Sequence, residues 1–321
     1  MGRAWRCAGL RWSARGPELA WDGGPRSALT WGKRVAFGVA DGGGRRCVGA
    51  RGHPCPVRAA VSARTAGARC EECGRLDRAH SVAADGIADD PRPYRVYLAW
   101  FGPGLVKVGI TGVGRGPDRL LEQGAVSFSW LGTGPLMAAR RTEELLRAAL
   151  RVPDRIPYGV KRAARAGLPP EEAERAAEIR ELHARAVRLD GWPETLAREP
   201  FRPVDHLHAF GLAGTPAAVA EVTELVPGGR VGGDLVAAAG PDLHLSTARG
   251  VVVLDTRLLR GWELVPARAE GAAGAQGGAG AAGAAGPAGG DGAPPDVTLP
   301  EVTLPVRDLT KTAAPLQDEL F

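Results

Sequence analysis

The chain has 321 residues, of which 44% are hydrophobic, and a formal net charge of +5. This length suits two domains, or one domain with appendages, and the hydrophobic content supports globular folding. From Ala267 to the end there are three basic and seven acidic residues, so the rest of the chain carries +9, which suits a polyanionic partner such as nucleic acid. No apolar run is long enough to span a bilayer, and residues 1–16 lack the apolar core of a signal peptide. We therefore expect a cytoplasmic protein with no membrane partner.

Residues 1–46 are predicted to form a β-rich N-terminal segment, because short apolar runs alternate with Gly or Pro turns. The expected strands are Leu10–Trp12, Leu19–Trp21, Leu29–Trp31 and Val35–Phe37. Four of the eight tryptophans lie in this segment, each beside basic residues or a turn. Packing of these rings in the core of a small sheet is one interpretation, and stacking on nucleic-acid bases is the other.

Residues 47–85 contain four of the five cysteines and are predicted to bind a metal ion. The spacing is Cys47-x7-Cys55-x14-Cys70-x2-Cys73, whose last pair is typical of a metal knuckle. A disulfide framework is unusual in a cytoplasmic chain. Four thiolates can instead hold a structural zinc ion that organises a segment poor in apolar residues. Free thiols and disulfides are the alternatives, and His53 is an alternative ligand to Cys55.

The central part of the chain, residues 86–165, is predicted to start with a β-hairpin. Residues 96–100 and 105–111 both alternate with period two, and a Gly-Pro turn joins them. The hairpin would bring Tyr97 near Lys107 and Gly109. A third strand is expected at Val126–Trp130.

Two helices follow the strand pattern of this central part. Pro117 suits the first turn of a short helix that carries Arg119, and residues 136–150 predict a longer helix. In the longer helix Glu143 lies on the apolar face, whereas Glu144 has arginines three and four residues away. A carboxylate on a packed face is costly unless a cation or a metal ion pairs with it. A helix-edge glutamate that reaches water is the alternative.

With these residues in this order, the chain resembles the GIY-YIG nuclease superfamily. It resembles more closely a bacterial family catalogued only as domain of unknown function 2797 (DUF2797), from about Cys47 to Leu150. The superfamily resemblance implies a three-stranded antiparallel sheet with flanking helices, and hydrolysis of DNA phosphodiesters with one Mg²⁺ or Mn²⁺ ion. Tyr97 matches the first tyrosine motif, Lys107 and Gly109 the second, Arg119 the helix arginine, and Glu143 the metal-binding glutamate. The chain departs from the pattern where Lys107 replaces a tyrosine and Gln123 replaces a histidine or tyrosine.

The resemblance also implies a role for each matched residue. Glu143 would hold the metal ion and Arg119 would clamp the phosphate. Tyr97 would position or deprotonate the attacking water, and Lys107 would contact phosphate or act as a base. The alternatives assign these residues no catalytic role: Tyr97 would be an aromatic residue of the core, and Lys107 and Arg119 would be solvated surface residues. The sequence therefore predicts a metal-dependent DNA endonuclease or repair protein, with a catalytically silent nucleic-acid-binding protein or a protein-interaction scaffold as alternatives.

Residues 166–203 and 204–266 are expected to form a helical spacer and a small β domain. The helix begins at Pro169-Pro170 and runs to about Leu189, with a composition typical of an exposed, ion-paired helix. The β domain is expected to be a barrel or sandwich that packs with the N-terminal strands, and its His206 and His208 to be exposed loop residues. Its predicted strands are Val219–Val226, Leu235–Ala238, Leu243–Ser246, Val251–Asp255 and Trp262–Val265.

Residues 267–321 are expected to be a disordered tail. Eighteen of the twenty residues 271–290 are Gly or Ala. Such a run has almost no side chains to bury, so nothing offsets the conformational entropy lost on ordering, and we expect a flexible tether. Residues 296–305 contain a short duplication. The last five residues resemble the peptide that docks bacterial repair proteins on the DNA polymerase sliding clamp, which implies that Leu320 and Phe321 fill an apolar pocket while Gln317 hydrogen-bonds at its edge. The predicted fold as a whole is modular and α+β.

Overall fold

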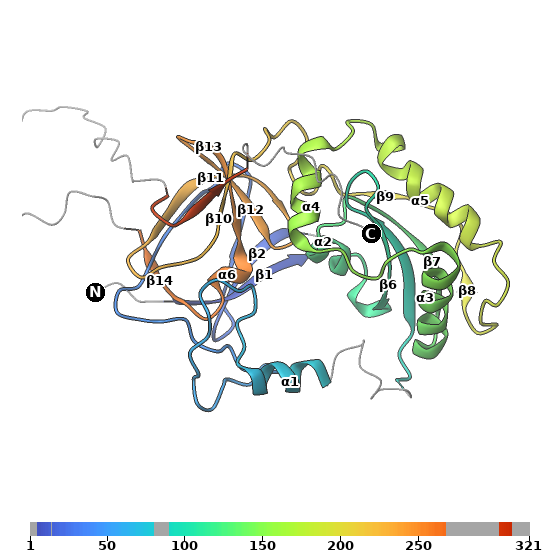
Figure 1. Ribbon diagram of the computed structural model, residues 1–321, viewed down its shortest axis with the longest axis horizontal. Coiled ribbons are helices and arrows are strands. Elements are labelled where there is room, and N and C mark those ends of the chain that lie inside the picture. Colours follow the sequence, from blue (N-terminus) through green and yellow to red (C-terminus); the bar gives the residue numbers. More distant parts are fainter. Residues whose placement is uncertain (1–4, 14, 80–89, 268–301, 310–321) are drawn as a thin grey trace, which may run out of the picture.

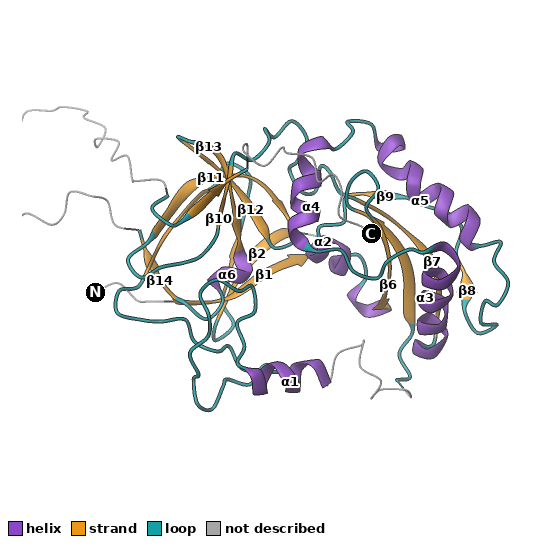
Figure 2. Ribbon diagram, in the orientation of Figure 1, coloured by secondary structure: helices purple, strands orange, loops and turns teal. Residues whose placement is uncertain are grey.

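Two β-sheets, one of ten strands and one of five, form the framework of the protein. The computed structural model describes residues 5–13, 15–79, 90–267 and 302–309. Helices α2 (Asp118–Gln123) and α4 (Tyr158–Ala164) lie between the two sheets (Figure 1). Most of the helices gather around the smaller sheet, as the colouring of Figure 2 shows. This architecture confirms the predicted α+β class.

The five-stranded sheet is built around the predicted hairpin. Strand β5 (Tyr94–Trp100) pairs antiparallel with β6 (Val106–Gly112) on one side and with β7 (Ser127–Gly134) on the other. Two short strands, β8 (Ala197–Arg198) and β9 (Val204–Asp205), both pair with β7 and extend the three strands expected from the sequence. A 3₁₀ turn, η1 (Val113–Arg115), joins β6 to the helix α2.

The two faces of this sheet have different neighbours. Val96, Leu98 and Trp100 share a buried core with residues of α3 (Leu136–Leu150) and α5 (Glu172–Ala186). Tyr97 belongs to a second core with residues of α2 and β7, on the opposite face of β5. The period-two pattern of the strand therefore separates a purely structural face from the face that carries Tyr97.

Helix α5 is part of this unit: the expected alternatives were an exposed, ion-paired spacer or a brace, and the helix packs on the sheet as a brace. Ala176 and Ile179 are fully buried against the sheet. Glu178 accepts a hydrogen bond from the indole of Trp100 at 3.1 Å. Buried Arg175 pairs with Asp205 of β9 at 2.7 Å. The polar composition of the helix hides these few packed positions.

The ten-stranded sheet joins the two ends of the chain. Strand β4 pairs with both β11 and β14, so the N-terminal segment and the β domain, expected as separate units that pack together, share one sheet. Their strands also share one hydrophobic core, which includes α6 (Thr256–Leu259). The sheet is open, with β15 and β3 at its edges. In spatial order its strands are β15 (Val306–Asp308), β10 (Ala220–Val222), β13 (Gly250–Asp255), β12 (Asp242–Thr247), β11 (Arg230–Ala239), β4 (Arg34–Val39), β14 (Glu263–Pro266), β1 (Trp5–Ser13), β2 (Gly16–Trp21) and β3 (Arg26–Ala28).

Two local predictions in these β regions are wrong. The third N-terminal strand is Arg26–Ala28 rather than Leu29–Trp31, because the chain turns where the Lys33 amide donates to the Thr30 carbonyl. His206 is buried rather than exposed, and its Nδ1 lies 2.9 Å from the carbonyl oxygen of Ala125. His206 thus has a structural role next to the small sheet.

Part of the expected disordered tail is ordered. Residues 306–308 form β15, which pairs antiparallel with β10, and Leu304 is buried in the large core. The expected tether at residues 271–290 and the last five residues lie outside the described residues. Within the part of the chain that the structure describes, no helix has the length and apolar character needed to cross a membrane.

The two sheets meet at a buried group of charges. Arg162 of α4 and Arg165 of the following 3₁₀ turn η2 (Arg165–Gly167) both donate to Asp242 of β12, at 2.6 Å. Asp242 is completely buried. Burial alone would raise the pKa of Asp242, but Arg165 and Arg162 outweigh it and hold the pKa below its usual range. Glu221 and Asp255 also pair with Arg162, and these five residues are called the ion cluster below.

Candidate functional site

Tyr97 lies at the centre of the candidate site, directly opposite Gly109 in the β5–β6 register. A Cβ atom added to Gly109 would lie 2.4 Å from the Tyr97 hydroxyl, so the ring crosses over the glycine and only glycine leaves room for it. The side-chain amide of Gln123 in α2 donates a 2.8 Å hydrogen bond to this hydroxyl. Burial raises the pKa of Tyr97, although Gln123 and Arg119 oppose the change. The hydroxyl is therefore a neutral, fixed group at neutral pH.

Lys107 lies beside Tyr97 on the same hairpin, as the alternating pattern predicted. Its Nζ is 5.6 Å from the centre of the Tyr97 ring and donates to the carbonyl of Asp154 at 3.2 Å. The side chain is nearly buried, and burial lowers the pKa of Lys107 to about 8, with help from Arg119 and against Glu143. About a tenth of this amine is therefore unprotonated at pH 7, far more than for an ordinary lysine.

Arg119 and Glu143 lie at the same site, each close enough to change the pKa of Lys107. The Arg119 side chain is 43% exposed and pairs with Glu122 at 3.6 Å, so much of the guanidinium is free to meet a ligand. Glu143 is half-buried, as its helix position predicted, and burial and Asp154 raise its pKa. Glu144, in contrast, is exposed and pairs with Arg147 at 3.1 Å.

Lys161 also belongs to this site, although the sequence reasoning missed it. It is buried, with its Nζ 3.7 Å from the ring centre of Phe101 and 4.8 Å from that of Tyr158. Burial lowers the pKa of Lys161 to about 7, and Lys107 is the next contribution. The sequence does contain a signal for it. Pro157 is typical of a helix start, and Tyr158 and Lys161 are three residues apart, so both side chains would lie on one face of α4.

The four predicted cysteines form a second, separate site below the large sheet, beside helix α1 (Glu71–Ala79). All five cysteines of the chain are free thiols. The sulfur atoms of Cys47, Cys55, Cys70 and Cys73 lie within 4.8 Å of one another. Tetrahedral zinc with sulfur ligands at about 2.3 Å requires sulfurs about 3.8 Å apart, so this cluster could hold such a metal ion.

The surroundings of the cysteine cluster also suit a metal ion. The amides of Gly49 and Cys70 donate to the Cys47 sulfur at 3.4 and 3.2 Å, which stabilises a thiolate. The backbone of Ala59 contributes most to lowering the pKa of Cys55 to about 7. Burial, together with the neighbouring thiols, raises the pKa of Cys73 to about 12. A bound cation would relieve this crowding of sulfurs, and His53 lies outside the cluster.

Arg45 attaches the cysteine segment to the large sheet. Its guanidinium donates to the carbonyls of Ser62 and Thr65 within the segment, and to those of Arg257 and Arg260 at the end of α6. It is almost fully buried and has no carboxylate partner among the described residues, and burial lowers the pKa of Arg45 to about 10. This arginine fixes the cluster relative to the sheet.

These observations define the class of the protein as α+β, with two sheets and a four-cysteine cluster that could hold a metal ion such as zinc. The chain belongs to the family described as Protein of unknown function (DUF2797), whose model matches residues 32–264. The match starts before β4 and ends within β14, so it is wider than the predicted range of Cys47 to Leu150 and includes strands of both sheets. No curated protein and no solved structure matches the chain.

Proposed function

We propose that the protein is a metal-dependent DNA endonuclease or DNA-processing enzyme of the GIY-YIG type. The observation that carries this proposal is the convergence of Tyr97, Lys107, Arg119 and Glu143 around one partly open site. These four residues come from β5, β6, α2 and α3, and no packing requirement alone explains a lysine, an arginine and a glutamate at one place. The residue types suit phosphodiester hydrolysis, which needs a phosphate clamp, a proton acceptor and a metal-binding carboxylate.

The geometry supports a more specific role for each of these residues than the sequence resemblance implied. Tyr97 positions the attacking water rather than deprotonating it, because its pKa is raised and its hydroxyl is held by Gln123. Lys107 takes the proton of that water, since its pKa of about 8 leaves part of the amine free at neutral pH. Arg119 clamps the phosphate, and Lys161 adds positive charge behind it.

A divalent metal ion fits the acidic side of this site. Burial raises the pKa of Glu143, and the nearby charge of Asp154 raises it too, so a cation at this position would stabilise the Glu143 carboxylate. Mg²⁺ characteristically binds one or two carboxylates together with substrate phosphate and water. Mg²⁺ or Mn²⁺ held by Glu143 would stabilise the charge on the leaving oxygen.

Cleavage assays with matched glutamate variants test this proposal. Purified protein is incubated with branched, nicked and duplex DNAs in Mg²⁺ or Mn²⁺. We expect cleavage by the wild type and a loss of about two to three powers of ten in Glu143→Gln, because several kcal/mol of stabilisation are removed. Glu144→Gln should stay close to wild type, since Glu144 is exposed and points away from the site. Equal cleavage by wild type and Glu143→Gln would refute the mechanism.

The pH dependence tests the role of Lys107 separately. If its amine accepts the proton of water, the cleavage rate rises with pH up to about 8, where the amine becomes mostly unprotonated, and is flat above it. Lys107→Arg keeps the positive charge but cannot lose a proton, so it should bind DNA and cleave slowly at every pH. A wild-type profile without this rise would exclude Lys107 as the base.

A catalytically silent DNA-binding protein is the second candidate, and the buried Tyr97 hydroxyl favours it. This hydroxyl already has a partner in Gln123 and little contact with solvent. In that case DNA binds without being cleaved, and replacing Lys107 or Arg119 reduces the salt dependence of binding by about one unit of slope.

We also propose that the C-terminal peptide docks on the DNA polymerase sliding clamp. The support is the sequence alone, because Gln317, Leu320 and Phe321 lie outside the described residues. Two apolar anchors and one amide match the small-anchor mode of peptide recognition, and the Gly/Ala-rich run before them has the composition of a flexible linker. We propose finally that the four cysteines of the cluster hold a structural zinc ion.

A further inference from the structure

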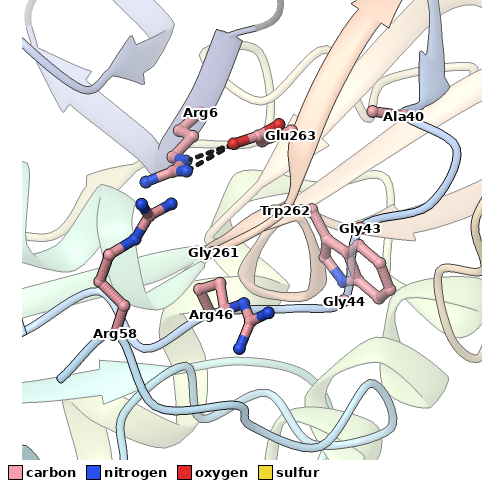
Figure 3. Close-up of a pocket in the computed structure, with 9 residues that line it drawn as sticks. All are labelled: Arg6, Ala40, Gly43, Gly44, Arg46, Arg58, Gly261, Trp262 and Glu263. Carbon is pink, nitrogen blue, oxygen red and sulfur yellow. Dashed lines mark hydrogen bonds and ion pairs between the residues drawn. The ribbon is translucent and has the colours of Figure 1, made fainter.

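A positively charged pocket lies where the start of β1, the loop after β4 and the cysteine segment meet β14 (Figure 3). Its volume is about 160 Å³. A cavity needs only about 10–15 Å³ in this measure to hold one water, so the pocket has room for a small polyatomic anion. It is distinct from the Tyr97 site and from the cysteine cluster. Its lining residues are Arg6, Ala40, Gly43, Gly44, Arg46, Arg58, Gly261, Trp262 and Glu263.

Three arginines supply the charge of this pocket. Arg6 pairs with Glu263, the one acid in the lining, at 2.5 Å. Among the described residues, neither Arg46 nor Arg58 has a partner for its guanidinium. Figure 3 shows the guanidinium groups of Arg6 and Arg58 facing each other, whereas that of Arg46 lies apart from them, on the side of Gly44 and Trp262. Like charges at such positions repel unless an anion lies between them.

The indole of Trp262 adds to the positive potential. Trp262 is 4% exposed, and its Nε1 has no hydrogen-bond partner among the described residues. Figure 3 places this nitrogen on the side of the ring nearer to Arg46. A buried N–H group without an acceptor is costly, so its position next to unpaired cations again indicates a missing negative group.

The backbone holds the arginines rigidly around the pocket. The Arg46 amide donates to the Gly261 carbonyl at 2.8 Å. A Cβ atom on Gly261 would lie 2.1 Å from the Arg46 carbonyl oxygen, so the two backbones are in close contact. Arg58 has a positive φ of 44°, a conformation that costs an L-residue free energy and is kept only where the surroundings enforce it. Cys47 directly follows Arg46, and the Arg58 amide donates to the carbonyl of Cys55 at 3.2 Å, so the backbone links both arginines to the cysteine cluster.

We propose that this pocket binds one phosphate group, either of a nucleic-acid backbone or of a small free phosphate. Phosphate suits the pocket because its several oxygens can accept hydrogen bonds from the facing guanidinium groups of Arg6 and Arg58, with Arg46 adding positive charge in the same lining, and arginine forks match its geometry. After the pairing of Arg6 with Glu263, the four charged residues of the lining still carry a net charge of +2, which a phosphate neutralises. The inference does not depend on the proposed nuclease activity.

Binding measurements on the full zinc-loaded chain test this inference with a matched pair of arginine variants. Titration calorimetry with inorganic phosphate, in a phosphate-free buffer with acetate as the control anion, gives the affinity for the free anion. Salt titrations of duplex DNA binding give the number of phosphate contacts. Arg58→Gln removes a pocket cation. Arg51→Gln is the control, because Arg51 lies in the same segment, is exposed, has a similar positive φ of 52° and does not line the pocket.

Arg58→Gln should weaken phosphate binding by about tenfold or more, whereas Arg51→Gln should change it less than about twofold. Glu263→Gln should strengthen it, because it removes the acid of the pocket without removing a cation. If the phosphate belongs to nucleic acid, Arg58→Gln also lowers the slope of DNA affinity against salt by about 0.9, and if it is a free phosphate the slope stays unchanged. Zinc content and thermal unfolding confirm that each variant is folded. Equal effects of the Arg58 and Arg51 variants, or weaker phosphate binding in Glu263→Gln, would overturn the inference.

Discussion

The crossing of Tyr97 over Gly109 predicts that a single added methyl group disrupts the candidate site. In Gly109→Ala the new Cβ would lie 2.4 Å from the hydroxyl oxygen and 2.5 Å from the Cζ atom of Tyr97. The ring cannot move away easily, because it is 1% exposed and packs edge-on against Trp130. Overpacking of this kind costs about 1–3 kcal/mol. Loss of the buried hydrogen bond from Gln123 costs about 1–3 kcal/mol more, so we expect a loss of about 2–6 kcal/mol in total.

Gly112→Ala is the matched control on the same strand. Gly112 also lies opposite a tyrosine, Tyr94, but a Cβ there would be 3.9 Å from the ring, an ordinary contact. This variant should be neutral or stabilised by about 0.4–1 kcal/mol through the entropy of the unfolded chain. Urea unfolding followed by tryptophan fluorescence gives both values, and DNA binding reports on the site. Stabilities of the two variants within about 0.5 kcal/mol of each other would refute this account of the Tyr97–Gly109 contact.

Three further predictions concern the metal cluster, the ion cluster and the C-terminus. Metal analysis should find one zinc per chain, lost in Cys70→Ser with partial unfolding but retained in Cys7→Ser. Asp242→Ala should cost about 3–5 kcal/mol by leaving the buried Arg165 without its carboxylate partner, against less than about 1 kcal/mol for the exposed Asp234→Ala. Because the folded pKa of Asp242 is depressed, its stabilisation is present above the unfolded pKa of about 3.9 and is lost as the pH falls through the lower folded value, which urea unfolding at several pH values measures. Removing residues 320–321 should abolish binding of the tail to the sliding clamp in titrations without changing the unfolding of the body; wild-type binding by the truncated chain would contradict the docking proposal.

Local patterns in the sequence were sufficient for the hairpin and the long helix. The alternation on either side of the Gly-Pro turn fixed the faces of β5 and β6, because a strand has a period of two and the turn sets the register. The helix at Leu136–Leu150 was predicted with its observed bounds. Its apolar stripe also distinguished half-buried Glu143 from exposed Glu144. In these elements the neighbours that decide each side chain's environment are close in the sequence.

Long-range pairings account for most of what the sequence could not show. Strand β4 pairs with β11, about 200 residues later, and β15 adds to β10 from a segment that composition marked as disordered. His206 was taken as exposed because nothing nearby in the sequence reveals its contact with Ala125. Lys161 was missed for the same reason. Its neighbours Phe101, Lys107 and Gln123 are all about 40 residues or more away along the chain.

The position of α4 explains why the candidate site needs both sheets. Consecutive residues of this helix have opposite tasks, since Lys161 reaches into the site while Arg162 joins the ion cluster on the large sheet. A helix of seven residues has too few internal hydrogen bonds to be stable alone, so the ion cluster must hold it in place. A second contact lies between Gly124 and Gly240. A Cβ atom on either glycine would lie close to the amide nitrogen of the other, so glycine at both positions lets α2 approach the large sheet. The large sheet therefore positions Lys161 and the α2 residues Arg119 and Gln123, although the site itself opens on the small sheet. This dependence agrees with a family match that spans strands of both sheets rather than the central hairpin alone.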